Sequence, residues 1–443
     1  MIDKADLTVN KGRRRFLIAA GTAAGSLVIG TWWFYRERDL LTAPAALGRS
    51  GDEHIFNAWL KIAGDGRILV QVPRQEMGQG ITTALPMLVA EELDADFADV
   101  GFEQAPIADL YANATMMAEG VPFRPDDHGW VAELMRFTQY KAGQALGLQA
   151  TGGSTSVRDA FEPMRRAGAT ARAMLVTAAA GRFGVPADAL TVRKSQVIHA
   201  ASGQQASFAE LAADAAALPM PRDVPLKTRE TFTLLGTPQK RIDIPAKVDG
   251  SATFGIDVRP SGMVYAAIAQ CPVLGGAVAR YDAGDVAERP GIRTVLELPA
   301  TRTSAAAVVV VADHYWQAQT ALSSIAIEWR GGEHAGHDTS EQRERYAALL
   351  QSEAGRVYDH AGEPAAQFAA APRTLEASYF APYLAHATLE PVNCTTLIRA
   401  DNTGEVWLGN QAPSLVRWIT AEAAGVDSAG ITVHTPYLGG GFG

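Results

Sequence analysis

The sequence contains only two cysteines, Cys271 and Cys394. Two thiols so far apart in the chain cannot build a disulfide framework or a cysteine-based metal site. An iron–sulfur cluster needs about four thiolates, so we expect none in this chain. The simplest interpretation of both cysteines is that they pack as small hydrophobic residues.

The chain also lacks an excess of basic residues. Its 39 Lys and Arg residues are outnumbered by 48 Asp and Glu residues, which gives a net charge of -9. Nucleic-acid binding needs a basic surface that neutralises phosphates, so we expect no nucleic-acid partner. With 443 residues, of which 47% are hydrophobic and 20% are charged, the chain has the length of about two or three globular domains.

Two familiar kinds of site motif are missing as well. No glycine-rich segment continues into Gly-Lys-Ser/Thr, so none is a P-loop, and none is a convincing dinucleotide-binding fingerprint. His334 and His337 are three residues apart, but glycines surround them. Without a matching carboxylate they indicate a solvated loop rather than a metal site.

What the chain does have begins near its N-terminus, where Arg13, Arg14 and Arg15 precede an uncharged run at residues 16–35. A basic cluster before an apolar run of nearly membrane-spanning length is typical of an export signal. The arrangement resembles a twin-arginine signal, although Gly12 stands where Ser or Thr is usual. We therefore expect export of the folded protein to the periplasm.

Two fates remain open for this N-terminal segment, residues 1–48. Ala43, Pro44 and Ala45 form a candidate cleavage site. Alternatively, residues 16–35 anchor the protein in the inner membrane, with the aromatic residues at their end lying at the membrane interface.

Three glycine-rich segments follow, at residues 76–80, 152–156 and 439–443. The first separates an alternating strand pattern from residues with helical spacing. The second precedes an alanine-rich helix in which Ser156 and Asp159 resemble a capping box. Helix starts offer unpaired N–H groups and a partial positive charge, which favour phosphate. One such loop is most simply a tight turn, but three together favour a ligand-binding cradle.

The rest of the chain divides by composition. Residues 218–250 are rich in proline and indicate a linker between domains. Residues 241–330 show strand, helix and strand patterns that predict a small α/β module. Residues 331–372 are polar and indicate a surface helix with loops, and residues 373–443 are rich in strand-forming residues.

Five short stretches together carry a family resemblance: EMGQG at residues 76–80, GGSTS at 152–156, HATLEP at 386–391, NQAPS at 410–414, and GGGFG at 439–443. In this combination and order they resemble the molybdopterin-binding large subunit of the xanthine oxidase superfamily. The closer similarity is to the isoquinoline 1-oxidoreductase beta subunit and membrane-bound aldehyde dehydrogenase large subunit type.

The resemblance implies an α+β fold. A first molybdopterin-binding region would span residues 49–240, and an α/β hammerhead module of the aldehyde oxidase and xanthine dehydrogenase type would span residues 241–330. A connecting segment at 331–372 would lead into the start of a second molybdopterin-binding region at 373–443.

The resemblance also implies which residues hold the cofactor. Gln79, Gly78 and Gly80 would hydrogen-bond the pterin. The cofactor's pyridine-like edge or its phosphates would lie against the second loop, at Gly153, Ser154, Thr155 and Ser156. Molybdenum would be held by the dithiolene of the pterin, so the protein would supply no direct metal ligand.

Around the metal, Gln411 matches the glutamine that hydrogen-bonds the apical oxo group. The loop that passes beside the metal would be formed by Gly440, Gly441, Phe442 and Gly443, with Phe442 lining the substrate funnel. His386 and Glu390 match a segment near that funnel, and a packed structural pair is an equally good interpretation of them.

The implied function is a molybdenum hydroxylase subunit that oxidises an aldehyde or an N-heteroaromatic compound, with water as the oxygen source. The implied cofactor is molybdopterin cytosine dinucleotide. Electrons would pass to a separate small [2Fe-2S] subunit and then to a membrane cytochrome c subunit.

One departure from the family concerns the end of the chain. Family members continue past the GGGFG motif into a second half that carries the general-base glutamate, and no residue of this chain matches that glutamate. We therefore expect a truncated chain, with no catalytic residue of its own and no turnover alone. A non-catalytic remnant, or a cofactor-binding scaffold that needs a second chain, is the alternative.

The export signal can be tested by replacing Arg13 and Arg14 together with lysine. Lysine keeps the charge but lacks the planar guanidinium of arginine, so a fused reporter should remain in the cytoplasm. Fractionation of cells into periplasm and cytoplasm measures the outcome. Unchanged export of the Lys-Lys variant would show that these arginines are not a twin-arginine signal.

Overall fold

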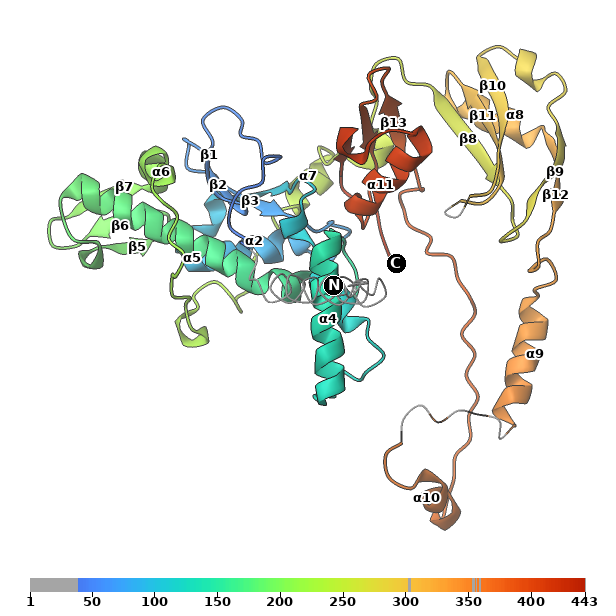
Figure 1. The fold of residues 1–443 in the computed structure, drawn as a ribbon, viewed down its shortest axis with the longest axis horizontal. Coiled ribbons are helices and arrows are strands. Elements are labelled where there is room, and N and C mark those ends of the chain that lie inside the picture. The colour runs from blue at the N-terminus through green and yellow to red at the C-terminus, as the bar shows by residue number, and fades with distance from the viewer. Residues whose placement is uncertain (1–38, 302–303, 353–354, 356, 358–359, 443) are drawn as a thin grey trace, which may run out of the picture. The chain divides into compact units, whose positions relative to one another are not determined.

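The structure is a computed structural model that describes residues 39–442, apart from residues 302–303, 353–354, 356 and 358–359 (Figure 1). The chain forms two compact units. The first combines Met1–Val258 with Ala385–Gly443, and the second is Arg259–Leu384. The predicted export signal, with Arg13 and Arg14, lies outside the described residues. Within the part that is described, no helix has the length and apolarity needed to cross a membrane.

A four-stranded sheet organises the first unit, in the order β1, β2, β3, β4. Its strands are β1 (His54–Asn57), β2 (Leu60–Ile62), β3 (Ile68–Val72) and β4 (Val100–Gln104). The alternating pattern before the 76–80 segment forms a hairpin, in which β2 and β3 pair as antiparallel neighbours. β3 and β4 are parallel, which requires a crossover, and α2 (Ile81–Leu93) provides it.

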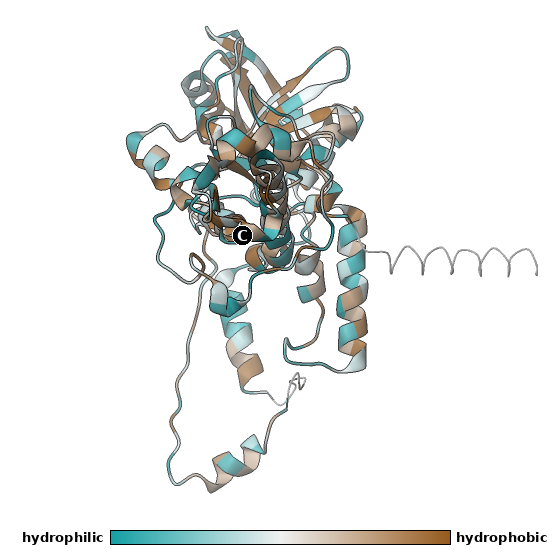
Figure 2. Ribbon diagram, turned by 90° about the vertical axis from the view of Figure 1, so that its left-hand side faces the viewer, coloured by the Kyte–Doolittle hydropathy of each residue, from teal (hydrophilic) through white to brown (hydrophobic). Residues whose placement is uncertain are grey.

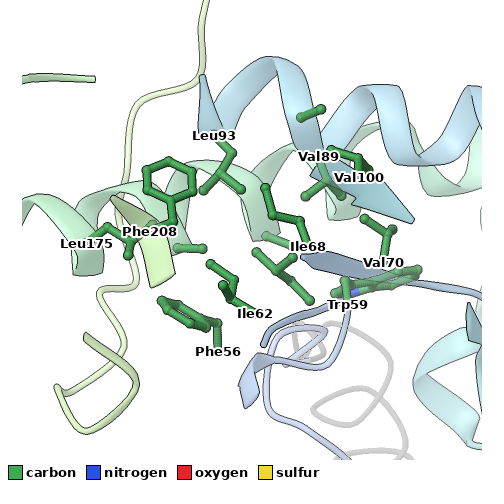
Figure 3. Packing of buried hydrophobic residues seen from close by; sticks show 14 of the residues in the cluster. Phe56, Trp59, Ile62, Ile68, Val70, Val89, Leu93, Val100, Leu175 and Phe208 are labelled. Atoms are coloured by element: carbon green, nitrogen blue, oxygen red, sulfur yellow. The ribbon is translucent and has the colours of Figure 1, made fainter. Parts of the chain in front are cut away.

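The core of this unit lies between α2, the sheet and a long helix, α5 (Ser156–Phe183) (Figure 3). Gly168 on α5 makes the close packing of the two helices possible, because a Cβ there would lie 2.4 Å from the carbonyl oxygen of Val89 on α2. Pro163 lies inside α5, which continues through it as one helix. α5 begins at Ser156, the last residue of the 152–156 loop, so the packing of this helix also fixes the position of the loop.

Smaller elements complete the first half of this unit. The strands β5 (Thr191–Arg193), β6 (Gln196–His199) and β7 (Gln204–Ser207) form an antiparallel sheet. The remaining helices are α3 (Ala114–Glu119), α4 (Trp130–Leu146), α6 (Phe208–Ala216) and α7 (Ile244–Asp249).

The C-terminal part of the unit repeats the architecture of its beginning. An antiparallel hairpin, β13 (Thr395–Ile398) and β14 (Gly404–Trp407), is followed by α11 (Pro413–Ala424) and by β15 (Ile431–His434), which is parallel to β14. The helix ends are similar too, because the C-cap residues, Asp94 after α2 and Gly425 after α11, both have left-handed backbone conformations. In each case a glycine-rich or amide-rich loop stands between strand and helix.

The second unit is a small α/β module. Its three-stranded sheet has the order β10 (Ile292–Leu298), β11 (Ala307–Ala312), β8 (Tyr265–Gln270), and β9 (Ala277–Asp282) pairs with β12 (Ala326–Arg330). One helix, α8 (Tyr315–Ser323), packs on the sheet, and α9 (Thr339–Leu350) and α10 (Pro364–Ala370) follow. Figure 2 shows hydrophobic and hydrophilic residues mixed along both the helices and the strands of the chain.

The expected α+β fold class is confirmed by this mixture of helices and sheets. The strands and helix expected within residues 241–330 are present, although residues 241–258 belong to the first unit. His334 and His337 are exposed in a turn, so the predicted solvated loop is confirmed for them.

The proline-rich segment expected to be a linker is instead attached along α2, and we call residues 227–243 the strap. At the C-terminal end of α2, the fully buried carboxylate of Glu91 accepts backbone N–H bonds from Thr233, Leu234 and Leu235. Lys227 lies beside it, with Nζ 2.9 Å from Glu91 Oε1 and 2.6 Å from Asp94 Oδ1.

Burial alone would raise the pKa of Glu91, but the hydrogen bonds from Leu235, Lys227 and Leu234 outweigh it and lower that pKa. Burial likewise works against the charged form of Lys227, but its hydrogen bonds to Asp94 and Glu91 raise its pKa. The charged forms of both groups therefore stabilise the fold near neutral pH.

We expect Lys227→Met to lower the free energy of unfolding at pH 7 by about 2 kcal/mol, because it removes a charged hydrogen-bond partner from a buried carboxylate. The deficit should shrink as the pH falls from 4.5, the ordinary pKa of glutamate, through the lower pKa of Glu91 in the folded protein, because the buried carboxylate is then protonated and no longer needs a cationic partner. Urea unfolding over this pH range measures it.

The matched control is Arg166→Met, which breaks the exposed pair of Arg166 with Glu162 on α5. An exposed pair spaced by four residues is worth about 0.3–0.5 kcal/mol. An equal loss for the two variants would contradict the role assigned to Lys227.

Candidate functional site

The 76–80 loop is organised by one buried carboxylate, that of Glu76. Its Oε1 accepts hydrogen bonds from the backbone N–H groups of Gly78 at 2.8 Å and Gly80 at 3.0 Å. Its Oε2 accepts from both the backbone N–H, at 3.1 Å, and the hydroxyl, at 2.8 Å, of Thr82 in the first turn of α2. A carboxylate at this place also interacts favourably with the positive end of the helix dipole.

Charged residues at the end of the strap, and Lys247 just after it, lie close to Glu76. Arg241 donates to Glu76 Oε1 at 3.1 Å and to the carbonyl oxygen of Gly78 at 2.7 Å. Arg241 and Lys247 both contact Asp243, each at its Oδ2. Burial opposes the ionisation of Asp243, but the hydrogen bonds from these two cations dominate and lower its pKa to about 2.

For Glu76 itself the balance is similar. Burial would raise its pKa, yet the hydrogen bonds from Thr82 and Gly80 outweigh that and lower it. The carboxylate is therefore charged at neutral pH, and the loop and helix N–H groups that face it are already paired.

Gln79 is exposed at the tip of this loop. Its Oε1 accepts from the backbone N–H of Met77, and its Nε2 donates to the carbonyl oxygen of Gln75, both at 2.8 Å. The structure thus gives the predicted pterin ligands Gln79, Gly78 and Gly80 partners within the loop itself, so their role toward a cofactor stays a prediction.

The 152–156 loop is stabilised by hydrogen bonds of Thr155, which is fully buried. The hydroxyl of Thr155 lies 2.8 Å from both Nδ2 of Asn113 and the carbonyl oxygen of Gly152. Gly153 and Ser154 are exposed with φ of 60° and 56°. Ser156 begins α5, and among the described residues no side chain caps this helix start.

Thr151 joins these loops to a third one. Its hydroxyl accepts the backbone N–H of Gln75 at 2.8 Å. The backbone N–H of Thr151 donates to the carbonyl oxygen of Gln411 at 2.6 Å. Nε2 of Gln411 donates in turn to the carbonyl oxygen of Thr151 at 2.8 Å. Residues more than 250 positions apart in the sequence are therefore fixed side by side.

The C-terminal glycine loop is attached to the same cluster. Leu438 N–H donates to the carbonyl oxygen of Glu76, and Nε2 of Gln75 donates to the carbonyl oxygen of Pro436. Gly441 has no room for a side chain, because a Cβ there would lie 2.4 Å from Sδ of Met77 and 3.0 Å from Oε1 of Gln411.

Glu390 has a structural use in this arrangement. Its Oε2 accepts the backbone N–H of Gly439 at 2.7 Å, while its Oε1 accepts from the backbone of Ile256 at 3.1 Å and from Asn393 Nδ2 at 3.0 Å. These contacts agree with a packed structural residue. His386 is exposed and makes no such contact with Glu390 among the described residues, so the two are not a mutually bonded pair.

Beside these loops lies a pocket of about 780 Å³. Its polar wall includes His386, Glu390 and Gln411, together with Gly440 and Gly441. The rest of the lining is largely apolar. Three of these side chains come from α11, namely Leu415, Val416 and Ile419, and the flanking residues Leu408 and Leu438 add to them.

The structure places one residue of the predicted metal-side loop away from this pocket. Phe442 is 72% exposed and does not line it, since a φ of 61° turns the chain at this residue. Gly443 lies outside the described residues. The structure thus brings Gln411, Gly440 and Gly441 together with His386 and Glu390, and sets Phe442 apart.

Three residues that organise this site had not been predicted: Glu76 as the anchor of its own loop, Arg241 and Thr151. A local signal existed only for Glu76, because a carboxylate shortly before a glycine-rich helix start can accept the free N–H groups there. Arg241 and Thr151 act through contacts that are distant in sequence.

The site is rich in amide donors and acceptors, and some are not used within the protein. Gln149 is fully buried next to Thr151, yet neither atom of its side-chain amide has a hydrogen-bond partner among the described residues, and the same holds for Oε1 of Gln75. Within the same residues, no group of three or more His, Cys, Asp or Glu side chains could hold a metal ion.

Comparison with known proteins places the chain near molybdenum enzymes. Residues 350–443 match the molybdopterin cofactor-binding domain family. The chain is 30% identical to the isoquinoline 1-oxidoreductase subunit beta of Brevundimonas diminuta, over 98% of this chain and 56% of that protein. It is also 30% identical to a membrane-bound aldehyde dehydrogenase [pyrroloquinoline-quinone] of Gluconacetobacter polyoxogenes, over 87% of this chain and 46% of that protein.

Among solved structures, quinoline 2-oxidoreductase from Pseudomonas putida 86 covers 47% of this chain and 31% of its own, with 20% identity and a TM-score of 0.36. The chain spans about half the length of the two curated relatives it matches.

Thr151→Val tests the junction between the loops. Valine has nearly the same shape but cannot accept the N–H bond of Gln75, and a buried unpaired N–H costs about 1–3 kcal/mol. Urea unfolding should show that loss. Thr151→Ser keeps the hydroxyl and should lose only about 0.8 kcal/mol for the missing methyl group. Equal losses in the two variants would contradict the assigned hydrogen bond.

Proposed function

Because this chain is a relative of the molybdopterin-binding large subunits of the xanthine oxidase family, we propose that it forms the cofactor-binding part of a molybdenum hydroxylase. The enzyme would oxidise an aldehyde or an N-heteroaromatic compound, with water as the source of oxygen. The observation that carries the proposal is the convergence of loops from 76–80, 151–156, 410–411 and 439–441 around Thr151 and Glu76.

The residues present fit such a cofactor. A pterin is polar and offers several hydrogen-bonding edges, so it suits a site built from amide groups. The buried amide of Gln149 and the Oε1 atom of Gln75 supply hydrogen-bonding capacity that the protein itself does not use. When bound, molybdopterin would supply the redox-active metal and its dithiolene ligands.

Each loop would have its own task. Gln411, which lies between Thr151 and Gly441, would point its side chain toward the metal. Because Gly440 and Gly441 have no side chains, they would let the backbone approach the cofactor closely. The 152–156 loop, whose helix start no side chain of the described residues caps, would take the negatively charged end of the cofactor.

The pocket beside the loops suits the proposed substrates. Its apolar wall from α11 would hold an aromatic ring or a hydrocarbon tail away from water, and the polar wall would face the reacting carbon. The two curated relatives are named for isoquinoline and for aldehyde, which supports the same two substrate classes here.

The finer parts of the proposal are the cytosine dinucleotide form of the cofactor, electron transfer to a small [2Fe-2S] subunit and a membrane cytochrome c subunit, and export by the twin-arginine route. The name "subunit beta" of a relative supports the existence of partner subunits, and the N-terminal sequence supports the export route. The cytosine dinucleotide form and the identity of the partner subunits follow from the family resemblance.

Purification of the protein from its native host, followed by metal analysis and mass spectrometry of the released pterin, tests the proposal. We expect molybdenum and a pterin in equal amounts, and reduction of a dye by an aldehyde or by isoquinoline only where the chain is part of a completed enzyme. Bound cofactor without turnover would favour the scaffold alternative, and absence of both molybdenum and pterin would refute cofactor binding.

Gln411→Ala tests the predicted contact with the metal centre. Loss of a hydrogen bond to a charged group is worth about 1.5–3 kcal/mol. In a completed subunit, turnover per bound molybdenum should therefore fall roughly tenfold to hundredfold if the bond strengthens in the transition state. Molybdenum occupancy, measured alongside the rate, should stay near that of the unmodified protein.

The control is Ser414→Ala. Ser414 Oγ accepts the backbone N–H of Gln149 and donates to the carbonyl oxygen of Gly147. Loss of these two bonds should lower stability and leave turnover per molybdenum unchanged. A normal rate per molybdenum in Gln411→Ala would assign Gln411 a structural role only, through its bond to Thr151.

A further inference from the structure

The start of α2 has the features of an anion site, yet an anion of the protein already occupies it. Helix N-termini attract negative charge through their free N–H groups and the helix dipole. Here the carboxylate of Glu76 accepts the N–H groups of Gly78, Gly80 and Thr82 at 2.8–3.1 Å. Gly80, the N-cap residue, has no side chain that could do this.

The surrounding charges confirm that this is a closed arrangement. Glu76 is 2% exposed, so its carboxylate is shielded from solvent. Arg241 neutralises it from one side and also binds the carbonyl oxygen of Gly78. The loop is therefore held at a backbone donor and a backbone acceptor by one ion pair.

We propose that Glu76 is a positioning residue that acts as a built-in substitute for a phosphate at the start of α2, so that the 76–80 loop takes its cofactor-binding shape before the cofactor arrives and accepts no phosphate itself. The inference rests on the proposed function in one respect, since it assigns this loop to the uncharged part of the cofactor. The shape of the loop and its closure to anions are properties of the chain alone.

The opposite end of α2 supplies a matched control. Glu91 is also buried and also accepts three backbone N–H bonds, from Thr233, Leu234 and Leu235, but these belong to the strap. Replacing either glutamate by glutamine keeps its size and removes its charge. The two variants should be destabilised by similar mechanisms in different places.

Amide hydrogen exchange on the full 443-residue chain without cofactor gives the first test. In Glu76→Gln, the amides of Gly78, Gly80 and Thr82 should exchange roughly tenfold to hundredfold faster, as expected for the loss of bonds to a charged acceptor. In Glu91→Gln these amides should keep their protection, and those of residues 233–235 should lose it. Equal exposure of the 76–80 loop in both variants would overturn the proposal.

Binding of inorganic pyrophosphate gives the second test. Glu76→Ala frees the N–H groups while Arg241 and Lys247 remain nearby, so millimolar pyrophosphate should protect the amides of residues 78–82 in this variant. The unmodified chain should show no protection there, and Glu76→Ala combined with Arg241→Ala should bind more weakly than Glu76→Ala.

Protection of the 76–80 loop by pyrophosphate in the unmodified chain would overturn the proposal, as would its absence in Glu76→Ala when exchange shows that variant to be folded. Neither measurement uses molybdenum or turnover. Failure of this inference is therefore distinguishable from failure of the proposed function, which depends on the metal and pterin content of the purified protein.

Discussion

The first unit depends on the buried carboxylate of Glu76. Its two oxygens bind the backbone of the 76–80 loop and the first turn of α2, and its charge is balanced by Arg241, about 165 residues later in the chain. The backbone carbonyl of the same residue accepts the N–H of Leu438. A buried charge of this kind is costly unless every lone pair is used, so its partners are confined to a narrow range of positions.

The same principle fixes segments that have no regular structure. Glu91 binds three consecutive backbone N–H groups of the strap, and Glu390 binds the backbone of both Gly439 and Ile256. Loops at the surface usually leave their backbone groups to water. Here carboxylates take the place of water, and each of them determines the path of a loop that contributes to the site or supports it.

A functional consequence is preorganisation. The loops around Thr151 and Gln411 are held by mutual hydrogen bonds of 2.6–2.8 Å. A site whose groups are fixed beforehand loses less conformational entropy when a large ligand binds. The unused amide of Gln149 and the pocket along α11 are the features that remain available within this fixed frame.

Much of the local structure was determined by the sequence itself. Glycines and turn residues with alternating apolar residues on either side predict the β2–β3 hairpin, the spacing of Leu85, Leu88 and Val89 predicts α2, and their mixture predicts the α+β class, because these signals act between near neighbours in the chain. The short motifs also lie in the loops that are joined through Thr151 and Glu76. Tertiary structure alone decided that the proline-rich segment is a strap and not a free linker, and that Glu390 holds Gly439. These contacts join residues tens to hundreds of positions apart through a few hydrogen bonds each. Such bonds leave no periodic pattern in the sequence, because either partner is compatible with many local conformations until packing brings the two together.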